Sequence, residues 1–485
     1  MRGWIRTAPC VLAALSLVSC SSRVARNPYA GLVHPDVLAK VGLQHYWTPL
    51  QVTLNPKETV RILYRLDENL YVLTSENRVI VIDAARPIIK WSAVIAGRNQ
   101  TVFPPCHADY VTLSEKPSGM KEILSPEKME TGPAFSAVMF NTLSDVLVFD
   151  RLNGRLVRKI PFQFAANSGG ASDGVYFYVG AINGLYHALY LQEAVPAWTL
   201  STDGVIKAPL QYFDGKLYVA SDDHTIRALQ IGRHPKLLWS KSTYGPLVAP
   251  FYVDIRGCFV PSDDGRIYAL DLAIGSPLWP PFICQGPLRD AIQVSAKTIF
   301  QYASRDRFYA VELTTGRQRW SMPQGRTVLA VMDGQVYLLD QAHNLVIVDE
   351  LLGTVKGTVP LTGLDVLLPN ITAPAIYGAT ADGRVTCIRP VSAGYLVPEM
   401  IKPITSQPAA PPPPVTSQPT TTQPGLKELP PPPPRPEPPP GERPAPPPPK
   451  PTPTPKPTPP PKPPGMPLPG APGMPGMPPI PPMGG

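Results

Sequence analysis

The residues of this sequence that could do chemistry are a serine in a hydrolase-like motif, dispersed histidines and two Asp-Asp pairs. Ser172 lies in Gly-Ala-Ser-Asp-Gly, which matches the G-x-S-x-G pattern of serine hydrolases. That motif needs a strand before the serine and a helix after it, whereas Ser172 is followed by Asp-Gly and a β-rich segment, which favour a hairpin. We therefore interpret Ser172 as a turn residue, and we predict that the protein is not an enzyme.

The histidines and acidic residues lack the spacing of metal ligands. The sequence contains no H-E-x-x-H motif, and its seven histidines, among them His187 and His224, are dispersed. The Asp-Asp pairs at 222–223 and 263–264 occur where Asp is the favoured residue of a hairpin turn. We expect packing and turn formation from these residues, and we predict no metal site.

The N-terminal residues have the features of an exported lipoprotein. Arg2 and Arg6 precede an apolar segment at 11–18 that is too short to span a bilayer, and Leu-Val-Ser-Cys follows at 17–20. This resembles the lipobox of bacterial lipoproteins, which implies cleavage after residue 19 and acylation of Cys20 with palmitate-type chains. Ser at position 21 favours the outer membrane under enterobacterial sorting rules. The alternative is an ordinary secretory signal peptide.

Four cysteines remain beyond the signal peptide and Cys20. They show no C-x-x-C spacing, which argues against zinc ribbons and c-type haem attachment. Four cysteines in an exported protein allow three disulfide pairings, and buried thiols are the alternative. These residues are Cys106, Cys258, Cys284 and Cys387.

Charge excludes a nucleic-acid-binding footprint. The formal net charge is +8, but Arg2, Arg6 and the excess of three basic residues in the C-terminal tail account for five of these charges. The remaining residues are close to neutral, so we expect no nucleic-acid partner.

A sequence motif recurs through the middle of the chain. In its complete form, two apolar residues precede an acidic residue, and Gly and Trp follow that acidic residue at +4 and +8, as in the motif that contains Asp271. Successive anchors are 37 to 41 residues apart, except for one gap of 67. The eight anchors are Asp83, Asp150, Tyr190, Gln230, Asp271, Glu312, Asp349 and Arg389.

Each period contains β-rich segments separated by Asp-Gly and Asn-Gly turns, which predicts a four-stranded antiparallel sheet. Repeated sheets of this length are typical of a β-propeller. We expect the acidic residue to cap the turn into the outer strand, Gly to take the left-handed conformation, and Trp to wedge against the next blade. These structural residues are Asp83, Trp91, Asp150, Gly154, Trp198, Trp239, Asp271, Gly275, Trp279, Glu312, Gly316, Trp320, Asp349 and Gly353.

The phrase A-x-D-x-x-x-G-x-x-x-W resembles the repeat of PQQ-type, or quinoprotein-like, propellers. Together with the lipobox it is similar to the BamB-type lipoproteins of the outer-membrane β-barrel assembly machinery. That resemblance implies an all-β, eight-bladed propeller that is anchored at the periplasmic face of the outer membrane. It also implies a role in delivering or folding outer-membrane proteins.

The ends of the repeat array predict how the ring closes. The eighth unit has no outer strand because Pro390 follows its third strand, while Trp47 near the N-terminus has no preceding hairpin. We predict that residues 43–50 close the ring against 372–389, within a propeller of residues 40–395. Residues 20–39 are expected to form a linker. The long gap predicts an insertion at 101–132, with a solvated loop or a short helix at 114–130.

The C-terminal segment 396–485 has a separate composition, since 39 of the 67 prolines lie from Pro403 onward. Polyproline segments interrupted by Thr, Lys and Arg cannot bury a core and favour an extended, disordered chain. We expect a spacer or tether, with docking of PxxP-type segments to a partner as the alternative.

Three functions follow from these features. The first is a non-enzymatic scaffold that binds outer-membrane assembly proteins or other envelope proteins as a monomeric subunit of a complex. The second is an envelope lipoprotein that contacts peptidoglycan through the tail. The third, a PQQ-dependent dehydrogenase, is disfavoured because the sequence has no adjacent cysteine pair and no long inter-blade insertions, so we predict no cofactor.

Overall fold

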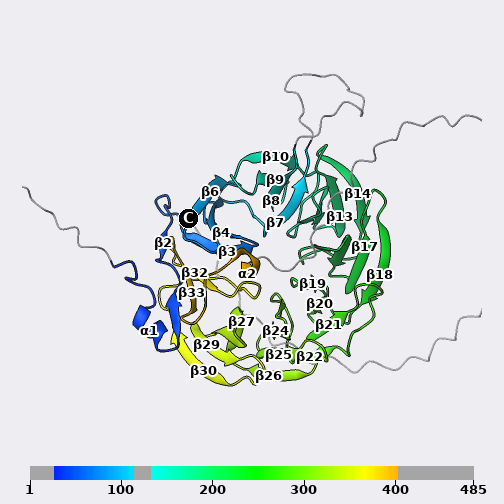
Figure 1. Ribbon diagram of the computed structural model, residues 1–485. Coiled ribbons are helices and arrows are strands. Elements are labelled where there is room, and N and C mark those ends of the chain that lie inside the picture. The colour runs from blue at the N-terminus through cyan, green and yellow to red at the C-terminus, as the bar shows by residue number, and fades with distance from the viewer. Residues whose placement is uncertain (1–26, 114–132, 402–485) are drawn as a thin grey trace, which may run out of the picture. The chain divides into compact units, whose positions relative to one another are not determined.

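The computed structural model describes residues 27–113 and 133–401. The expected signal peptide, Cys20, the 114–130 segment and the tail after residue 401 lie outside the described residues. Eight antiparallel sheets are arranged around a central axis (Figure 1). The predicted all-β, eight-bladed propeller is therefore confirmed. In the described part of the chain, no helix is long and apolar enough to cross a bilayer.

Blades 1 to 4 each contain four strands in chain order from the axis outward. Blade 1 contains β3 (Val60–Leu66), β4 (Asn69–Thr74), β5 (Arg78–Asp83) and β6 (Ile89–Val94). Blade 2 contains β7 (Cys106–Val111), β8 (Phe135–Asn141), β9 (Asp145–Asp150) and β10 (Leu156–Pro161). Blade 3 contains β11 (Ala171–Ser172), β12 (Tyr176–Gly180), β13 (Leu185–Tyr190) and β14 (Val195–Ser201). Blade 4 contains β15 (Gln211–Phe213), β16 (Lys216–Ala220), β17 (Thr225–Gln230) and β18 (Lys236–Ser242).

Blades 5 to 7 repeat this order, and blade 8 is assembled from both ends of the propeller sequence. Blade 5 contains β19 (Tyr252–Asp254), β20 (Gly257–Pro261), β21 (Arg266–Leu270) and β22 (Phe282–Ile283). Blade 6 contains β23 (Gln293–Val294), β24 (Thr298–Tyr302), β25 (Phe308–Glu312) and β26 (Gln318–Met322). Blade 7 contains β27 (Gly325–Met332), β28 (Gln335–Asp340), β29 (Asn344–Asp349) and β30 (Val355–Pro360). Blade 8 contains β31 (Val366–Leu367), β32 (Ile376–Ala379), β33 (Arg384–Pro390), β1 (Leu43–His45) and β2 (Leu50–Gln51).

Burial follows the position of a strand within its blade. Every residue of the second strands β4 and β20 is buried, because neighbouring blades pack on both sides of them. The outer strand β14 has no fully buried residue, and five of its seven residues are exposed. The core is thus divided into layers between adjacent blades.

The meander gives the disc two distinct faces. Face 1, as defined here, carries the turns from first to second and from third to fourth strand of each blade. Face 2 carries the turns from second to third strand and the connections between blades.

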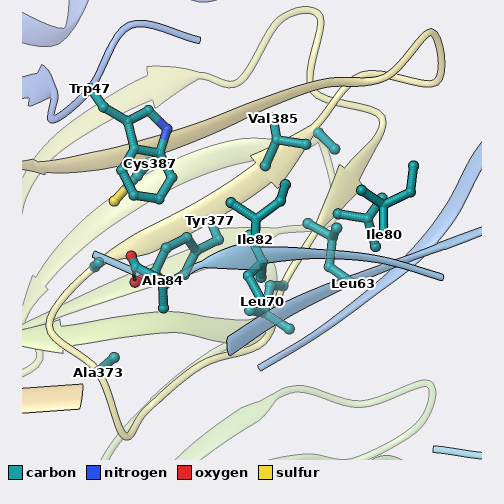
Figure 2. Packing of buried hydrophobic residues seen from close by; sticks show 14 of the residues in the cluster. Trp47, Leu63, Leu70, Ile80, Ile82, Ala84, Ala373, Tyr377, Val385 and Cys387 are labelled. Atoms are coloured by element: carbon teal, nitrogen blue, oxygen red, sulfur yellow. Dashed lines mark hydrogen bonds between the residues drawn. The ribbon is translucent and has the colours of Figure 1, made fainter. Parts of the chain in front are cut away.

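The N-terminal strands close the ring. Strand β1 pairs antiparallel with β33, with Leu43 opposite Pro390 and His45 opposite Ile388, and β2 extends this pairing at Leu50. The predicted closure of 43–50 against the last blade is therefore observed. Figure 2 shows the adjoining core, in which Trp47 lies beside Cys387 of blade 8, and Tyr377 of blade 8 lies toward Leu70 and Ile82 of blade 1.

The propeller extends beyond the 40–395 expected from the repeats at both of its ends. Helix α1 (Pro35–Ala39) and the residues before it pack on blades 7 and 8, where Leu32, Val33 and Leu38 are buried. At the other end, residues 391–401 and helix α2 (Pro398–Ile401) cross face 1 from blade 8 to blade 1, and Ile401 is buried there. The repeat pattern could not indicate these segments because they lie outside it.

The segment expected as an insertion contains part of a blade. Residues 106–111 of 101–132 form β7, the innermost strand of blade 2, which pairs with β8. The start of the expected insertion at 101 is therefore too early. The sequence did not reveal this strand because Cys106–Val111 contains no turn pair of the kind that separates strands in the other blades.

Candidate interaction surface

The tryptophans of the repeat lie at the seams between blades. In five seams the indole N–H donates to a backbone carbonyl of the next blade, close after the anchor of that blade. The pairs are Trp91 with Arg151 (3.0 Å), Trp198 with Gly232 (3.1 Å), Trp239 with Leu272 (3.1 Å), Trp279 with Leu313 (3.1 Å) and Trp320 with Glu350 (2.9 Å). In four of these outer strands the ladder shifts by one residue immediately before the Trp, at Trp91, Trp198, Trp239 and Trp320. Such a bulge redirects the side chain toward the next blade.

The glycines of the repeat are required both for backbone conformation and for Trp packing. Gly275 has φ of +70°, and a Cβ there would lie 2.6 Å from the ring of Trp239 in the preceding blade. The same overlap would occur at Gly154 with Trp91, at Gly316 with Trp279 and at Gly353 with Trp320, all at positive φ.

The acidic residues of the repeat organise the turns into the outer strands. Asp271 Oδ1 accepts hydrogen bonds from the backbone N–H groups of Ala273 (2.8 Å) and Ile274 (3.0 Å). Asp150 and Asp349 accept equivalent bonds from the residue two positions later. Asp83 also accepts two backbone N–H groups, although its turn lacks the glycine. Glu312 instead accepts from the hydroxyl of Thr315 and from Arg319.

At the other three seams, contacts other than an indole N–H bond to the next blade join the blades. In blade 2, Arg158 takes the Trp position and donates to the carbonyl of Leu191 at 3.0 Å. In blade 7 the position is Gly357, which is covered by Val41 from the N-terminal segment. The sequence pattern did not indicate these substitutions, because an arginine and a glycine have no periodic signature there.

At the closing seam, the indole N–H of Trp47 is buried and has no hydrogen-bond partner among the described residues. The Tyr377 hydroxyl donates to the carbonyl of Ala84 at 2.8 Å instead. The motif residues are thus structural parts of the ring, and function has to be sought on its surface.

Exposed apolar side chains are concentrated on face 1. Among the described turns, connections and the 391–401 segment, twelve exposed large hydrophobic residues belong to face 1 and three to face 2. Those of face 1 are Ile88, Leu152, Val175, Ile255, Ile274, Leu278, Leu351, Leu352, Val391, Tyr395, Val397 and Met400. Those of face 2 are Leu143, Ile182 and Tyr244. Exposed apolar groups gathered on one face indicate a binding surface.

Turn geometry does not require these residues to be apolar. Leu352 and Leu152 are each 73% exposed, and they occupy turns in which the backbone N–H groups, not the side chains, bind the acidic anchor. The equivalent turn of blade 6 has Thr314 and Thr315. We therefore regard the face 1 turn tips as the candidate interaction surface.

A buried charged cluster lies under face 1 between blades 1 and 2. The Arg151 guanidinium is 6% exposed and forms ion pairs with Asp109 (3.0 Å), Glu68 (3.3 Å) and Asp67 (3.4 Å). His107 lies 2.6 Å from Asp67 through Nδ1. Burial lowers the pKa of His107, an effect that is opposed by its hydrogen bond to Asp67. The cluster fixes β7 against blade 1, next to the start of the 114–132 segment.

The central opening does not present the donors of a calcium-dependent quinone site. A hollow of about 220 Å³ is lined there by Arg65, Tyr252, Gln293, Asn370 and Thr372, among others, and its lining contains no carboxylate. The guanidinium of Arg65 is already bonded to the carbonyls of Asp67 (2.7 Å) and Ile401 (2.8 Å). Calcium is bound by carboxylate and amide oxygens. This lining has no carboxylate, and the amide oxygens of Gln293 and Asn370 already accept hydrogen bonds from the backbone N–H groups of Val328 and Ala373, so these residues do not fit that group.

The other candidate residues lie in structural positions. The Ser172 hydroxyl donates to the Tyr176 carbonyl at 2.7 Å within the blade 3 hairpin. His187 stacks on Phe164 with ring centroids 3.7 Å apart, and His224 has φ of +64° in its turn. Asp223 and Asp264 accept backbone N–H groups within their own turns. In the described ranges, no group of three His, Cys, Asp or Glu side chains is placed to hold a metal ion.

The four cysteines at 106, 258, 284 and 387 are free thiols. Burial raises the pKa of Cys106 and of Cys284 to about 12. Burial also raises the pKa of Cys258 and Cys387. All four therefore stay protonated and unreactive at neutral pH.

Comparison with known proteins supports the repeat assignment. A PQQ-type family model described as outer membrane protein assembly factor BamB matches residues 236–366. The structure of BamB from Moraxella catarrhalis is similar to 72% of this chain and 100% of its own, with a TM-score of 0.52 and 13% identity. The computationally designed Ika8 protein is similar over 70% and 98%, with a TM-score of 0.51 and 14% identity. No curated protein matches the chain. The chain is thus a PQQ-like propeller that resembles BamB.

Proposed function

We propose that this protein is a non-enzymatic scaffold, anchored by lipid to the periplasmic side of the outer membrane, that takes part in the assembly of outer-membrane β-barrel proteins. The BamB-like propeller and the lipobox at Cys20 support this proposal. The single observation that carries it is the concentration of exposed apolar turn tips on face 1.

The geometry suits protein binding better than chemistry. A closed ring of buried seams holds its turn tips rigidly, so a partner that docks on face 1 meets a preformed surface. Full burial of one Leu or Ile side chain contributes about 1.5–3 kcal/mol, and several such tips give a substantial contact. The polar groups that could react, such as those of Ser172 and His107, are engaged in turns and in a buried cluster.

A pull-down of the full-length lipidated protein from lightly crosslinked membranes tests this function. The proposal predicts that subunits of the barrel assembly machinery are enriched in the eluate. Enrichment of peptidoglycan fragments alone would contradict it and favour the wall-binding alternative. Co-purification of calcium with a redox-active quinone would favour the dehydrogenase.

A matched pair of variants links the result to face 1. Leu352→Ser removes an exposed apolar tip, whereas Thr315→Ser changes the equivalent turn of blade 6 and retains its hydroxyl. We expect the first variant to reduce capture of the assembly subunits and the second to leave it unchanged. Equal capture by both variants would remove Leu352 from the contact.

A further inference from the structure

We propose that the face 2 edge of blades 7 and 8 lies directly against the phospholipid surface, with face 1 turned away from the bilayer. This inference rests on the proposed lipid anchor at Cys20. It goes beyond that proposal by stating which surface of the propeller the membrane meets.

The first argument is the length of the tether. Only seven residue steps separate Cys20 from Asn27, where the described fold begins. A fully extended chain covers at most about 3.6 Å per residue, so this tether reaches at most about 25 Å. Whatever part of the propeller holds residue 27 must therefore stay close to the bilayer.

The second argument is where the tether joins the fold. The Arg384 guanidinium donates to the carbonyl of Ala30, and His45 Nε2 lies 2.9 Å from the carbonyl of Val33. Arg384 begins β33 at face 2, and a Cβ on Gly363, in the connection from blade 7 to blade 8, would overlap the carbonyl of Gly31. The tether is thus held at the face 2 edge of these two blades.

The third argument is the cost of the opposite orientation. Strands of six residues, such as β29 and β30, separate the two faces by about 20 Å, at roughly 3.3 Å per residue. Turning face 1 toward the lipid would consume most of the 25 Å tether in crossing the edge of the disc. The short tether therefore favours face 2.

The surface chemistry of this edge indicates contact without insertion. None of the exposed large hydrophobic residues lies in 27–34, 50–57, 360–365 or 380–384, which make up the face 2 edge of these blades. In blades 7 and 8 they are instead on the face 1 side, at Leu351, Leu352, Val355 and Val391. The apolar tips consequently remain available to protein partners.

The end of the described chain lies on the opposite side. The carbonyl of Ile401 accepts a hydrogen bond from Arg65, near the turn between β3 and β4 on face 1, and Ile401 is 2% exposed. In this orientation the described chain therefore ends on the side of the disc that faces away from the membrane.

Site-specific fluorescence quenching tests this orientation. A maleimide dye is attached to Thr362→Cys, on the face 2 edge, or to Leu352→Cys or Ile274→Cys, on face 1. The lipidated full-length protein is placed in phosphatidylethanolamine and phosphatidylglycerol vesicles that contain headgroup-nitroxide lipid. Native thiols are buried or half-buried, and unsubstituted protein gives the labelling background. We expect quenching at position 362 to be several-fold stronger than at 352 and 274. Quenching at 352 or 274 equal to or stronger than at 362 would overturn the inference.

The Cys20→Ala variant separates this inference from the proposed function. If the anchor is correct, this change releases the protein from the vesicles and abolishes quenching at all three positions. Retention of the Cys20→Ala variant on vesicles would contradict the anchor itself. A wild-type protein that is bound but quenched mainly on face 1 would contradict the orientation alone.

Discussion

Gly275 shows how a single residue serves both a turn and a seam. Its φ of +70° disfavours any side chain, and the Trp239 ring occupies the space of a Cβ. We predict that Gly275→Ala lowers the free energy of unfolding by about 2–5 kcal/mol, from about 1–2 kcal/mol of left-handed strain and about 1–3 kcal/mol of overpacking. Denaturant unfolding of the variant measures this loss.

Gly334→Ala is the matched control. Gly334 has φ of +71°, but nothing lies within 4 Å of the position of its Cβ. This variant carries the backbone strain alone, so it should lose only about 1–2 kcal/mol. Equal losses in the two variants would show that Trp239 does not press on Gly275.

Glu58 makes the free energy of unfolding decrease at acidic pH. Burial acts to raise the pKa of its carboxyl, but hydrogen bonds from Arg78, Thr74 and the backbone of Asn55 outweigh burial and lower the pKa to about 2. Because the folded pKa lies below the unfolded one, this stabilisation is complete above about pH 4.5 and is lost as pH falls toward 2. Glu58→Gln should therefore be less stable than wild type at pH 7, by on the order of 2–3 kcal/mol, with the difference shrinking below pH 4.5. A difference that stays constant from pH 7 to pH 2 would rule out this ion pair as its source.

At the scale of elements, the N-terminal segment covers the outer edge of blade 8 and the seam between blades 7 and 8. Strand β1 pairs with β33, and Val41 covers Gly357 at the Trp position of blade 7. Deletion of residues 27–51 should expose the edge of β33 and the core residues that Leu43 covers, such as Ile376 and Ile388, so we expect a lower melting temperature and self-association. Light scattering after size-exclusion chromatography detects the oligomers. Deletion of residues 21–26 is the control, and a monomeric 27–51 deletion variant with unchanged melting temperature would contradict the role of the segment.

Elements with local signatures could be predicted from sequence, and elements that depend on distant contacts could not. The 40-residue period, the Asp-Gly turns and Trp47 indicated eight blades and their closure, because each blade repeats the same turn chemistry. The two-residue strand β22 follows Pro280 and Pro281, which remove ladder donors, and its pairing depends on β21. The passage of 391–401 across face 1 is fixed by Arg65 and the core of blade 1, contacts more than 300 residues away in sequence.

The sequence repeat also could not predict the candidate interaction surface on face 1. An apolar residue such as Leu352 in a turn could equally belong to a core, and only the fold shows that it is exposed. Arg158 in place of a seam Trp is likewise recognised only from its bond to Leu191. The sequence therefore predicted the framework, and the structure located the surface.

At the scale of the whole propeller, the two faces differ in what they present. Face 1 carries most of the exposed apolar tips and the end of the described chain, whereas the chain enters at the face 2 edge of blades 7 and 8. A lipid tether at this edge would present face 1 to partners in the periplasm. The proposed scaffold function depends on this division.

Photocrosslinking in intact cells tests this difference between the two faces most directly. A photoreactive amino acid is placed at Leu152 or Leu352 on face 1, and at Leu143 or Ile182 on face 2, all of which are exposed apolar positions. We predict adducts with subunits of the barrel assembly machinery from the face 1 positions and not from the face 2 positions. Adducts with those subunits from face 2 alone, or from none of the four positions, would contradict the account.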